Sequence, residues 1–455
     1  MRKIFYAIPL LILLLALLLL CVSCSGDNSA DLENNEPVHK GTITLSVYNW
    51  GEYISDGSED SFNTNAAFEE YYYQLTGQRV EVLYTTYSNN EEMYSKLSSN
   101  AGTYDVIIPS DYMIERMIAE DMLLPFDATS IENFAYISDE FKGDSCKYDP
   151  TNMYSVPYTY GMVGVIYNTS LINPDDLNDD GEIADPSWGL MWNPDYAGKI
   201  LQFNNPRDAF GTAMYYKNID INTASADEWD SVLELLKEQK PLLQAYVNDE
   251  IFNKMSTGSA AIAPYYAGDF IIMNSENEDL AFYYPKEGTN YFVDAMCIPK
   301  NARYPDVAKE YINFMLSEEP AIANALYIGY ASPNTLVKNS EEYAEEMGEY
   351  AMDILYGKTI SEAKGSYSYD LDYRSLIDLE LEGADGEKLG TNVQTYLNNQ
   401  WERLKTWSAV ELWVHIVSIT IVVAILSLCI YNIYIKKKRS RFYRYRDRAK
   451  KGNSQ

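Results

Sequence analysis

The sequence predicts an α/β fold in which layers of helices cover a sheet. Stretches with the period of a strand alternate with stretches of helical period along most of the chain, a pattern typical of layered sheets with mainly parallel strands. The 455 residues are enough for two lobes with cores of their own. Apolar runs at residues 4–22 and 412–435 set the body of the chain apart from its two ends.

The first predicted strand leads into the most informative turn of the sequence. Residues 43–47 alternate apolar and polar side chains, the period of a strand with one buried face. The strand stops at the run 49–52, where Gly51 frees the backbone for a tight turn. The turn presents Trp50 and Glu52 together at a strand end, and an indole beside a carboxylate suits a cation. A buried Trp next to a solvated Glu is the simpler alternative.

The other elements follow in alternation. Helices are expected at residues 62–75, 91–99, 112–120, 229–237, 307–316 and 321–326. Strands are expected at residues 80–84, 105–108, 154–158, 161–167 and 260–263.

Composition excludes several classes of function. His39 and His415 are the two histidines of the chain, which argues against His-based catalysis and His-rich metal sites. The chain lacks the G-x-S-x-G, H-E-x-x-H and P-loop motifs, so an enzyme is not expected. The formal net charge is −32 although residues 436–451 are strongly basic, and such an acidic body repels nucleic acid. Cys146 and Cys297 are the cysteines of the body, and their spacing leaves open whether they meet.

The N-terminal end has the layout of a secretory signal. Arg2 and Lys3 precede the apolar run, and small residues surround Cys24. We expect residues 1–24 to be a signal peptide of the lipoprotein type with Cys24 as its lipidation site, followed by a polar tether at 25–41. An uncleaved anchor is the alternative.

The C-terminal end predicts a transmembrane helix. Residues 412–435 would reach roughly 36 Å as a helix, enough for a bilayer core of about 30 Å. The basic segment 436–455 follows at once, and such a segment stays cytoplasmic. We therefore expect a protein of the cell membrane whose body is extracytoplasmic and whose tail is cytoplasmic. Stop-transfer explains the tail, and contact with anionic membrane lipid is an alternative.

One acidic loop matches the beginning of a calcium-binding loop. Asp176, Asn178 and Asp180 have the spacing of its first three ligands. Ser187 stands at the twelfth position, where a Glu is expected. A surface loop rich in Asp and Asn explains the segment equally well.

Eight segments in the same order together resemble the spermidine/putrescine-binding proteins of polyamine ABC transporters. They are YNWGEY (48–53), YSNNEEMYSKL (87–97), YDVIIPSDYMI (104–114), SVPYTYGMVGVIYN (155–168), WNPDYAGKI (192–200), NNPRDAF (204–210), PKEGTNYFVDAMCIPKNA (285–302) and IGYASPN (328–334). The resemblance implies a two-lobed fold of the type II periplasmic binding-protein kind, with a ligand cleft between lobes that close by hinge motion. It also implies a polyamine ligand, an ABC permease and ATPase as partners, and no cofactor.

The same resemblance suggests a division of the body into lobes. The chain is expected to cross between lobes near Pro157, Asp294 and Pro333. The resulting parts are lobe 1 at 42–157, lobe 2 at 158–293, a return to lobe 1 at 294–335 and C-terminal helices of lobe 2 at 336–405.

Eleven residues are implied as ligand-binding by the matching motifs. Carboxylates would bind ammonium groups, and aromatic faces would flank the methylene chain. The set is Trp50, Glu52, Tyr53, Ser110, Tyr112, Asn205, Asp208, Tyr266, Phe292, Asp294 and Tyr330.

Three of these positions depart from the pattern of spermidine binders. Asn205 stands where that pattern has an acidic residue, and Tyr266 and Phe292 stand where it has Trp. Our hypothesis is that the ligand preference shifts toward a diamine, so that Asn205→Asp would strengthen triamine binding.

Two other functions remain open on the sequence. The adjacent Tyr265 and Tyr266 resemble the tyrosine pair with which ferric-ion binders of similar fold hold iron. A membrane-anchored polyamine sensor is the other alternative, and its short tail would require a signalling partner.

Overall fold

The computed structural model describes residues 41–58, 61–99, 102–358, 362–365, 375–382, 388–408 and 412–452. The predicted signal peptide, with Cys24, lies outside the described residues, as does the predicted tether up to residue 40.

Ten strands form one mixed sheet in the order β2-β1-β3-β9-β4-β7-β5-β6, with β8 paired to β4 and β10 paired to β9. β11 and β12 form a separate antiparallel pair. The strands are β1 (Ile43–Trp50), β2 (Val80–Tyr87), β3 (Val106–Ile107), β4 (Ser155–Asn168), β5 (Ile200–Phe203), β6 (Leu243–Val247), β7 (Ile262–Tyr266), β8 (Leu280–Tyr283), β9 (Thr289–Cys297), β10 (Lys364–Gly365), β11 (Ser375–Glu382) and β12 (Lys388–Asn392).

The helices account for the predicted helical segments and add several more. The α-helices are α2 (Thr64–Thr76), α3 (Asn90–Ser98), α4 (Asp111–Ala119), α5 (Pro206–Tyr216), α6 (Ala226–Gln239), α7 (Glu250–Ser256), α8 (Ala267–Glu276), α9 (Pro305–Met315), α10 (Glu318–Ile328), α11 (Thr335–Lys338), α12 (Glu341–Tyr356), α14 (Val393–Thr406) and α15 (Leu412–Gly452). Short 3-10 helices occupy η2 (Ala128–Ser130), η3 (Glu132–Tyr136), η4 (Asp139–Phe141), η5 (Gly143–Ser145), η6 (Pro174–Asp176), η7 (Trp188–Trp192), η8 (Pro194–Tyr196) and η9 (Lys240–Leu242).

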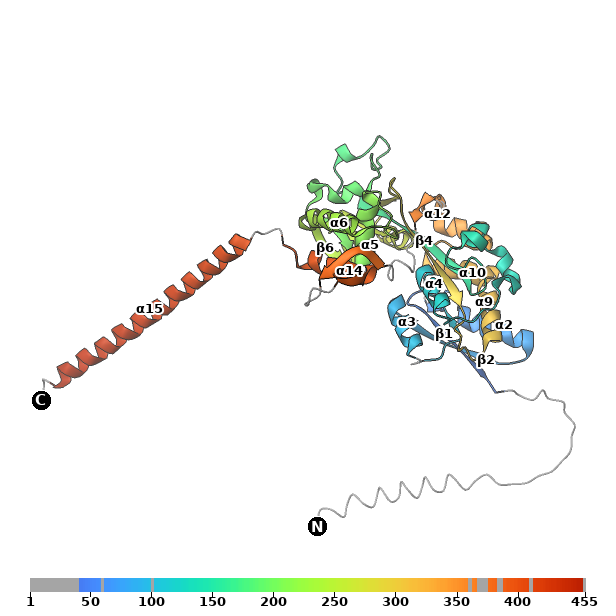
Figure 1. Ribbon diagram of the computed structural model, residues 1–455, viewed down its shortest axis with the longest axis horizontal. Coiled ribbons are helices and arrows are strands. Elements are labelled where there is room, and N and C mark those ends of the chain that lie inside the picture. The colour runs from blue at the N-terminus through green and yellow to red at the C-terminus, as the bar shows by residue number, and fades with distance from the viewer. Residues whose placement is uncertain are drawn as a thin grey trace, which may run out of the picture. The chain divides into compact units, whose positions relative to one another are not determined.

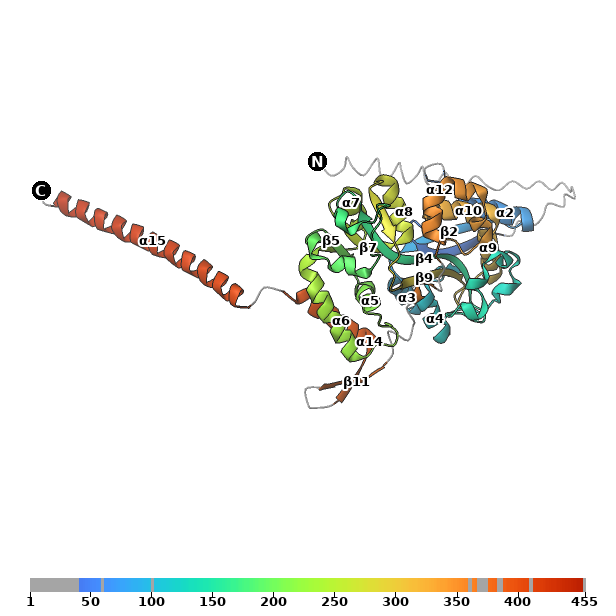
Figure 2. The same cartoon turned by 90° about the horizontal axis from the view of Figure 1, so that it is seen from above.

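The sheet has two parallel flanks joined by an antiparallel centre (Figures 1 and 2). β1 is parallel to β2 and β3 in the first flank, and β5 is parallel to β6 and β7 in the second. β4 and β9 form the centre, where β9 is antiparallel to both β3 and β4. The prediction of mainly parallel strands is wrong here, because β9 carries the chain back toward the first flank along β4.

β4 is one long strand where the sequence predicted two extended runs. All fourteen of its residues are buried, because helices and loops cover both faces of the centre. Gly161 does not interrupt the strand. A Cβ at this position would lie 2.8 Å from the ring of Phe292, so the glycine makes room for that ring.

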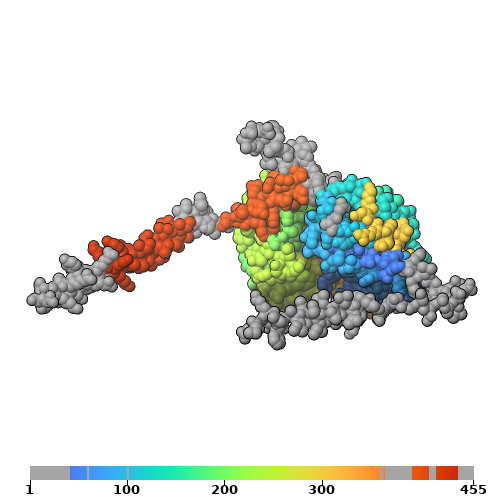
Figure 3. Space-filling model, turned by 90° about the horizontal axis from the view of Figure 1, so that it is seen from below, coloured from blue at the N-terminus to red at the C-terminus, as the bar shows by residue number. Residues whose placement is uncertain are grey.

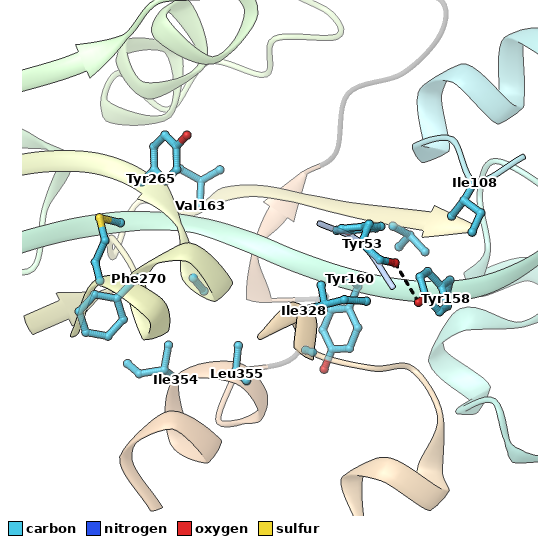
Figure 4. Packing of buried hydrophobic residues seen from close by; sticks show 14 of the residues in the cluster. Tyr53, Ile108, Tyr158, Tyr160, Val163, Tyr265, Phe270, Ile328, Ile354 and Leu355 are labelled. Atoms are coloured by element: carbon cyan, nitrogen blue, oxygen red, sulfur yellow. Dashed lines mark hydrogen bonds between the residues drawn. The ribbon is translucent and has the colours of Figure 1, made fainter. Parts of the chain in front are cut away.

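The main hydrophobic core follows β4 through both flanks. The close view in Figure 4 shows Tyr158 and Tyr160 toward one end of this strand and Val163 toward the other. The Tyr158 hydroxyl donates to the backbone oxygen of Tyr53 at 3.1 Å, which ties the turn after β1 to the centre of the sheet (Figure 4). Cys146 and Cys297 are both buried and both free, so they form no disulfide with each other.

α14 packs against the second flank although it lies far along the chain. It contacts α5 and α6, and Figure 3 shows its orange surface against the yellow-green segment. Lys240 fixes the end of this helix, because its Nζ donates to the carbonyls of Leu404, Lys405 and Trp407 at 2.6–2.8 Å. A cation on the last carbonyls of a helix stabilises its C-terminus.

α15 contains the second predicted apolar run. Its segment Val417–Lys438 is long and apolar enough to cross a membrane by length and composition, and it is exposed. The helix continues as backbone through the basic segment to Gly452.

Candidate functional site

Most of the predicted site residues follow the carboxyl ends of parallel strands. In the first flank, Trp50 ends β1, and its Nε1 donates to the carbonyl of Ile108 at 2.9 Å, just beyond β3. The Trp50 ring lies 6.5 Å from that of Tyr53. This hydrogen bond fixes the indole at the edge where β1 and β3 end together, which is where open α/β sheets place their ligands.

Asp294 and Tyr53 form the best-defined contact of the site. The Tyr53 hydroxyl donates to Asp294 Oδ2 at 2.6 Å and lies 2.7 Å from Thr159 Oγ1. Both site residues are buried, and Asp294 is 4% exposed. Within the described part of the chain, Asp294 Oδ1 has no hydrogen-bond partner. The carboxylate is therefore held by one oxygen and has accepting capacity left on the other.

A second tyrosine and carboxylate pair lies in the second flank. Asp208 stands in the first turn of α5, and the hydroxyl of Tyr266, at the end of β7, donates to its Oδ2 at 2.9 Å. Asn205 caps α5 through Oδ1, which accepts from the Asp208 amide, and its Nδ2 donates to Asp208 Oδ2 at 2.8 Å. Asn205 is thus tied to Asp208 by both ends of its side-chain amide.

The third pair includes a residue that the sequence reasoning missed. Tyr330 donates its hydroxyl to Asp269 Oδ2 at 2.8 Å. Asp269 lies in the first turn of α8, three residues after Tyr266. A carboxylate in the first turn of a helix that directly follows a strand is the signal that would have pointed to it.

Aromatic rings connect the three pairs. The ring of Phe292 lies 5.5 Å from that of Tyr266 and 5.7 Å from that of Tyr330, and Tyr330 lies 6.1 Å from Tyr53. All three ring pairs meet edge to face, the arrangement that ring quadrupoles favour. Gly268 makes room for Tyr330, since a Cβ there would lie 2.7 Å from the ring. We call these seven residues the Tyr-Asp cluster: Tyr53, Asp208, Tyr266, Asp269, Phe292, Asp294 and Tyr330.

Ser110 and Tyr112 lie beside the cluster at the start of α4. Asn90 bonds to both, donating Nδ2 to Ser110 Oγ at 3.0 Å and to the Tyr112 hydroxyl at 3.2 Å. The backbones of Ser110 and Asp294 form a bridge, which places Ser110 next to the buried carboxylate. The guanidinium of Arg207, from the second flank, lies 4.2 Å over the Tyr112 ring. The protein's own cation therefore covers one of the predicted aromatic faces.

Glu52 lies outside the Tyr-Asp cluster in this structure. It is exposed, its φ of 52° is left-handed, and its Oε2 accepts from the hydroxyl of Tyr327 at 3.2 Å. The contact is with α10 rather than with another predicted ligand residue.

Burial raises the pKa of three carboxyls at the site. The pKa of Asp294 is raised to about 6 by desolvation, which outweighs the lowering by the neighbouring Ser110 and by the Tyr53 hydroxyl. Desolvation raises the pKa of Asp269 to about 7, although the Tyr330 hydroxyl lowers it. Asp111, which the sequence reasoning also passed over, is 5% exposed, and desolvation together with the nearby Asp294 raises its pKa to about 8.

The calcium-loop residues are engaged in local contacts. The Tyr196 hydroxyl donates to Asp176, and Asn178 Oδ1 accepts from the amides of Asp180 and Glu182. Among the described residues, no three His, Cys, Asp or Glu side chains gather as a metal ion requires. The loop is closed by its own asparagine, as in an Asx turn.

The tyrosine pair considered for iron is engaged in contacts within the protein. The two rings meet edge to face with centroids 5.1 Å apart, Tyr265 also stacks on Phe203 at 5.5 Å, and the Tyr266 hydroxyl donates to Asp208. Burial raises the pKa of both hydroxyls, which opposes the tyrosinate form that iron binding needs.

The Tyr-Asp cluster contains three carboxylates around a continuous aromatic surface. Each carboxylate is oriented by a tyrosine hydroxyl, and ionised carboxylates bind ammonium groups by charge-assisted hydrogen bonds. The rings between them provide apolar contact and attract cations. The arrangement suits an organic cation with several charges separated by apolar stretches.

Comparison with known proteins agrees with this chemistry. Residues 65–348 match the family model described as bacterial extracellular solute-binding protein. The spermidine/putrescine-binding periplasmic protein of Salmonella typhimurium is 30% identical over 337 residues, which cover 73% of this chain and 89% of the relative. The chain belongs to the bacterial extracellular solute-binding protein family. The recognition of the spermidine/putrescine-binding family from sequence motifs is confirmed, and with it a solute-binding protein rather than an enzyme.

Other relatives and solved structures extend the same similarity. The spermidine/putrescine-binding periplasmic protein of Escherichia coli is 29% identical, covering 68% of this chain and 83% of the relative. A spermidine/putrescine substrate-binding protein of Streptococcus pneumoniae superposes with a TM-score of 0.60 at 28% identity, covering 80% of this chain and 98% of that one. A putative spermidine/putrescine transporter protein of Listeria monocytogenes superposes with a TM-score of 0.61 at 29% identity, covering 80% and 99%. The α/β fold of the periplasmic solute-binding proteins is thereby shown for this chain.

Proposed function

We propose that this protein is the substrate-binding component of an ABC transporter and binds polyamines of the putrescine and spermidine type in the Tyr-Asp cluster. The observation that carries the proposal is the set of three carboxylates, Asp208, Asp269 and Asp294, each held by a tyrosine hydroxyl at 2.6–2.9 Å around one aromatic surface. Each charge-assisted bond to an ammonium contributes about 1.5–3 kcal/mol, and each aromatic face about 0.5–2 kcal/mol.

We infer that the two flanks of the sheet belong to two lobes that open and close around the ligand. The ring of Tyr330 contacts Tyr53 of the first flank while its hydroxyl donates to Asp269 of the second, and Arg207 from the second flank covers Tyr112. A ligand chain that enters the cluster must separate such rings and replace their contacts. β4 and β9 run from one flank to the other, which supports hinges in the centre of the sheet.

Asp269 supplies a carboxylate to the cluster, which offsets the negative charge lost where Asn205 replaces an acidic residue. Our hypothesis of a diamine preference rested on the loss of one charge at position 205, and this reason weakens once Asp269 is counted. Asn205 instead holds Asp208 in place through two hydrogen bonds. The resemblance-based roles of Trp50, Ser110, Tyr112 and Glu52 as further ligand contacts remain part of the proposal.

We further propose that the protein is held at the membrane with its binding body outside the cell membrane. The apolar segment of α15 supports one anchor, followed by a basic cytoplasmic tail. Lipidation of Cys24 would provide a second. The expected partners are an ABC permease and its ATPase, to which a loaded receptor delivers its ligand.

Calorimetry on the full-length protein in detergent tests the proposal. Protein freed of copurified ligand would be titrated with putrescine, cadaverine, spermidine and spermine. We expect tight binding of one or two of them, and a loss of at least about tenfold in affinity for Asp294→Asn, which removes one charge-assisted bond. Asp279→Asn, a change to an exposed carboxylate outside the cluster, is the matched control. Folded protein that gives no heat with any of the four amines would refute polyamine binding.

A further inference from the structure

Asn290 extends the line of ligand-binding side chains on β9. Side chains two residues apart share one face of a strand, so Asn290, Phe292 and Asp294 lie on the same face. Asn290 is 4% exposed, and its Oδ1 has no hydrogen-bond partner among the described residues. A buried acceptor without a partner costs free energy unless a ligand or water supplies a donor.

Asn290 lines a small cavity that also reaches Asp208. The cavity has a volume of about 10 Å³, room for about one water-sized group. Its lining includes Asn290, Asp208, Thr212, Trp188, Phe203 and Tyr215. Three aromatic side chains, a carboxylate and an unpaired amide oxygen are the groups that recognise an ammonium.

The cavity is linked to the Tyr-Asp cluster through Asp208. This carboxylate lines the cavity and also accepts the Tyr266 hydroxyl at 2.9 Å. Thr212 adds no free donor, because its hydroxyl donates to the Ala209 carbonyl at 2.9 Å and accepts from Gln202 at 3.1 Å. Among the described lining side chains, the Asn290 oxygen is the buried acceptor without a partner, and an ammonium matches it with a donor.

The spacing along β9 determines which ligands can reach the cavity. At about 3.3 Å per residue, Asn290 and Asp294 lie about 13 Å apart along the strand. An extended amine chain advances about 1.25 Å per bond, so the end nitrogens of spermidine lie about 11 Å apart and those of putrescine about 6 Å. A triamine held at Asp294 therefore reaches the cavity within hydrogen-bond distance, and a four-carbon diamine does not.

We propose that the cavity between Asn290 and Asp208 is a terminal ammonium subsite that selects triamines over short diamines. The subsite deepens the proposed polyamine binding and rests on it. One ammonium of the ligand binds Asp294, the chain lies along Phe292, and the far ammonium donates to Asn290 Oδ1 and Asp208.

Calorimetry with putrescine and spermidine on full-length variants tests the subsite. Asn290→Leu keeps the side-chain size and removes the acceptor, and Asn290→Asp keeps the shape and adds a charge. We expect Asn290→Leu to lose at least about tenfold in spermidine affinity with less than about twofold change for putrescine. Asn290→Asp should raise the ratio of spermidine to putrescine affinity.

Each other outcome overturns the subsite. Equal losses for both amines would show a structural role, and no loss would show that the cavity holds only water. Where circular dichroism shows Asn290→Leu to be unfolded, Asn290→Asp decides alone, and an unchanged or lower affinity ratio refutes the subsite. Wild-type protein that binds neither amine refutes polyamine binding and the subsite together. Polyamine binding that does not depend on Asn290 refutes the subsite alone.

Discussion

Polyamine binding should weaken steeply on acidification, because two carboxyls of the Tyr-Asp cluster titrate between pH 5 and pH 8. Burial raises the pKa of Asp294 to about 6 and that of Asp269 to about 7 in the ligand-free protein. The amines of the ligand titrate near pH 10, as lysine does, and stay charged throughout this range. The perturbation therefore changes the site and leaves the ligand unchanged.

The magnitude follows from the two pKa values. An ammonium binds the ionised carboxylate, so binding must expel a proton from each carboxyl that is protonated at the working pH. At pH 5 a pKa of about 7 costs about 100-fold in affinity and a pKa of about 6 about tenfold, each tenfold being about 1.4 kcal/mol. The affinity for the polyamine is therefore full above about pH 8 and falls as the pH drops through 7 and then 6. Together the two carboxyls predict a loss of about 1000-fold, or about 4 kcal/mol.

The assay is calorimetry with spermidine at pH 5, 6, 7 and 8, at constant ionic strength because salt screens charges. Asp269→Asn should leave only the part due to Asp294, so the fall between pH 8 and pH 5 shrinks to about tenfold. Circular dichroism at each pH verifies that the protein stays folded. Affinity that is constant, or that rises on acidification, would refute the assignment of these two carboxyls as ammonium ligands.

Three further changes give distinct expectations. Asp111 should contribute a fall of up to about 4 kcal/mol to wild-type stability between pH 5 and pH 8, because its pKa is raised to about 8 and the folded state keeps a proton that the unfolded state has released; urea denaturation of Asp111→Asn should show a pH slope that is smaller by this amount. Gly268→Ala brings a Cβ to 2.7 Å from the Tyr330 ring and should weaken spermidine binding about tenfold by calorimetry, whereas Gly51→Ala, with open space, should not. Asn205→Asp keeps the helix cap but sets two carboxylates side by side, so thermal melting should show lower stability without ligand and calorimetry a gain in spermidine affinity. Asn205→Ser is the control, because it keeps a capping side chain and adds no charge. If Asn205→Asp does not raise the spermidine affinity, the argument from charge is contradicted.

Local patterns gave most of the fold, because helix and strand periods are properties of the sequence itself. Apolar alternation predicted β1 and β2, and the helical period predicted α2, which Gly77 ends in the left-handed conformation with a φ of 69°. The antiparallel centre was missed for a different reason. Pairs such as Gly161 with Phe292 join residues far apart in the chain, and the period of a strand does not reveal its partner.

The sequence predicted the site residues that lie at strand ends. It did not predict those whose role depends on a partner far away in the chain. Motif context pointed to Tyr53 and Asp294, which the structure brings within 2.6 Å. Asp269 was missed because its partner Tyr330 lies sixty-one residues away, and a lone Asp in a helix resembles a solvated residue. Asn205 looked like a ligand that had lost its charge, yet a helix cap explains its side chain as well.

The position of the charges follows from how the two flanks end. β5 and β7 are parallel neighbours, so α5 and α8 begin at the same edge of the sheet and place Asp208 and Asp269 in their first turns. A carboxylate at position 205 would stand at the cap of α5, next to Asp208, whereas Asp269 stands at α8, next to Tyr330. The charge is therefore shifted along the cluster toward the ring that meets the first flank. An ammonium that binds Asp269 would meet the Tyr330 hydroxyl, and the ring of the same tyrosine contacts Tyr53 of the first flank. Binding of the ligand's charge and closure of the flanks therefore share this residue.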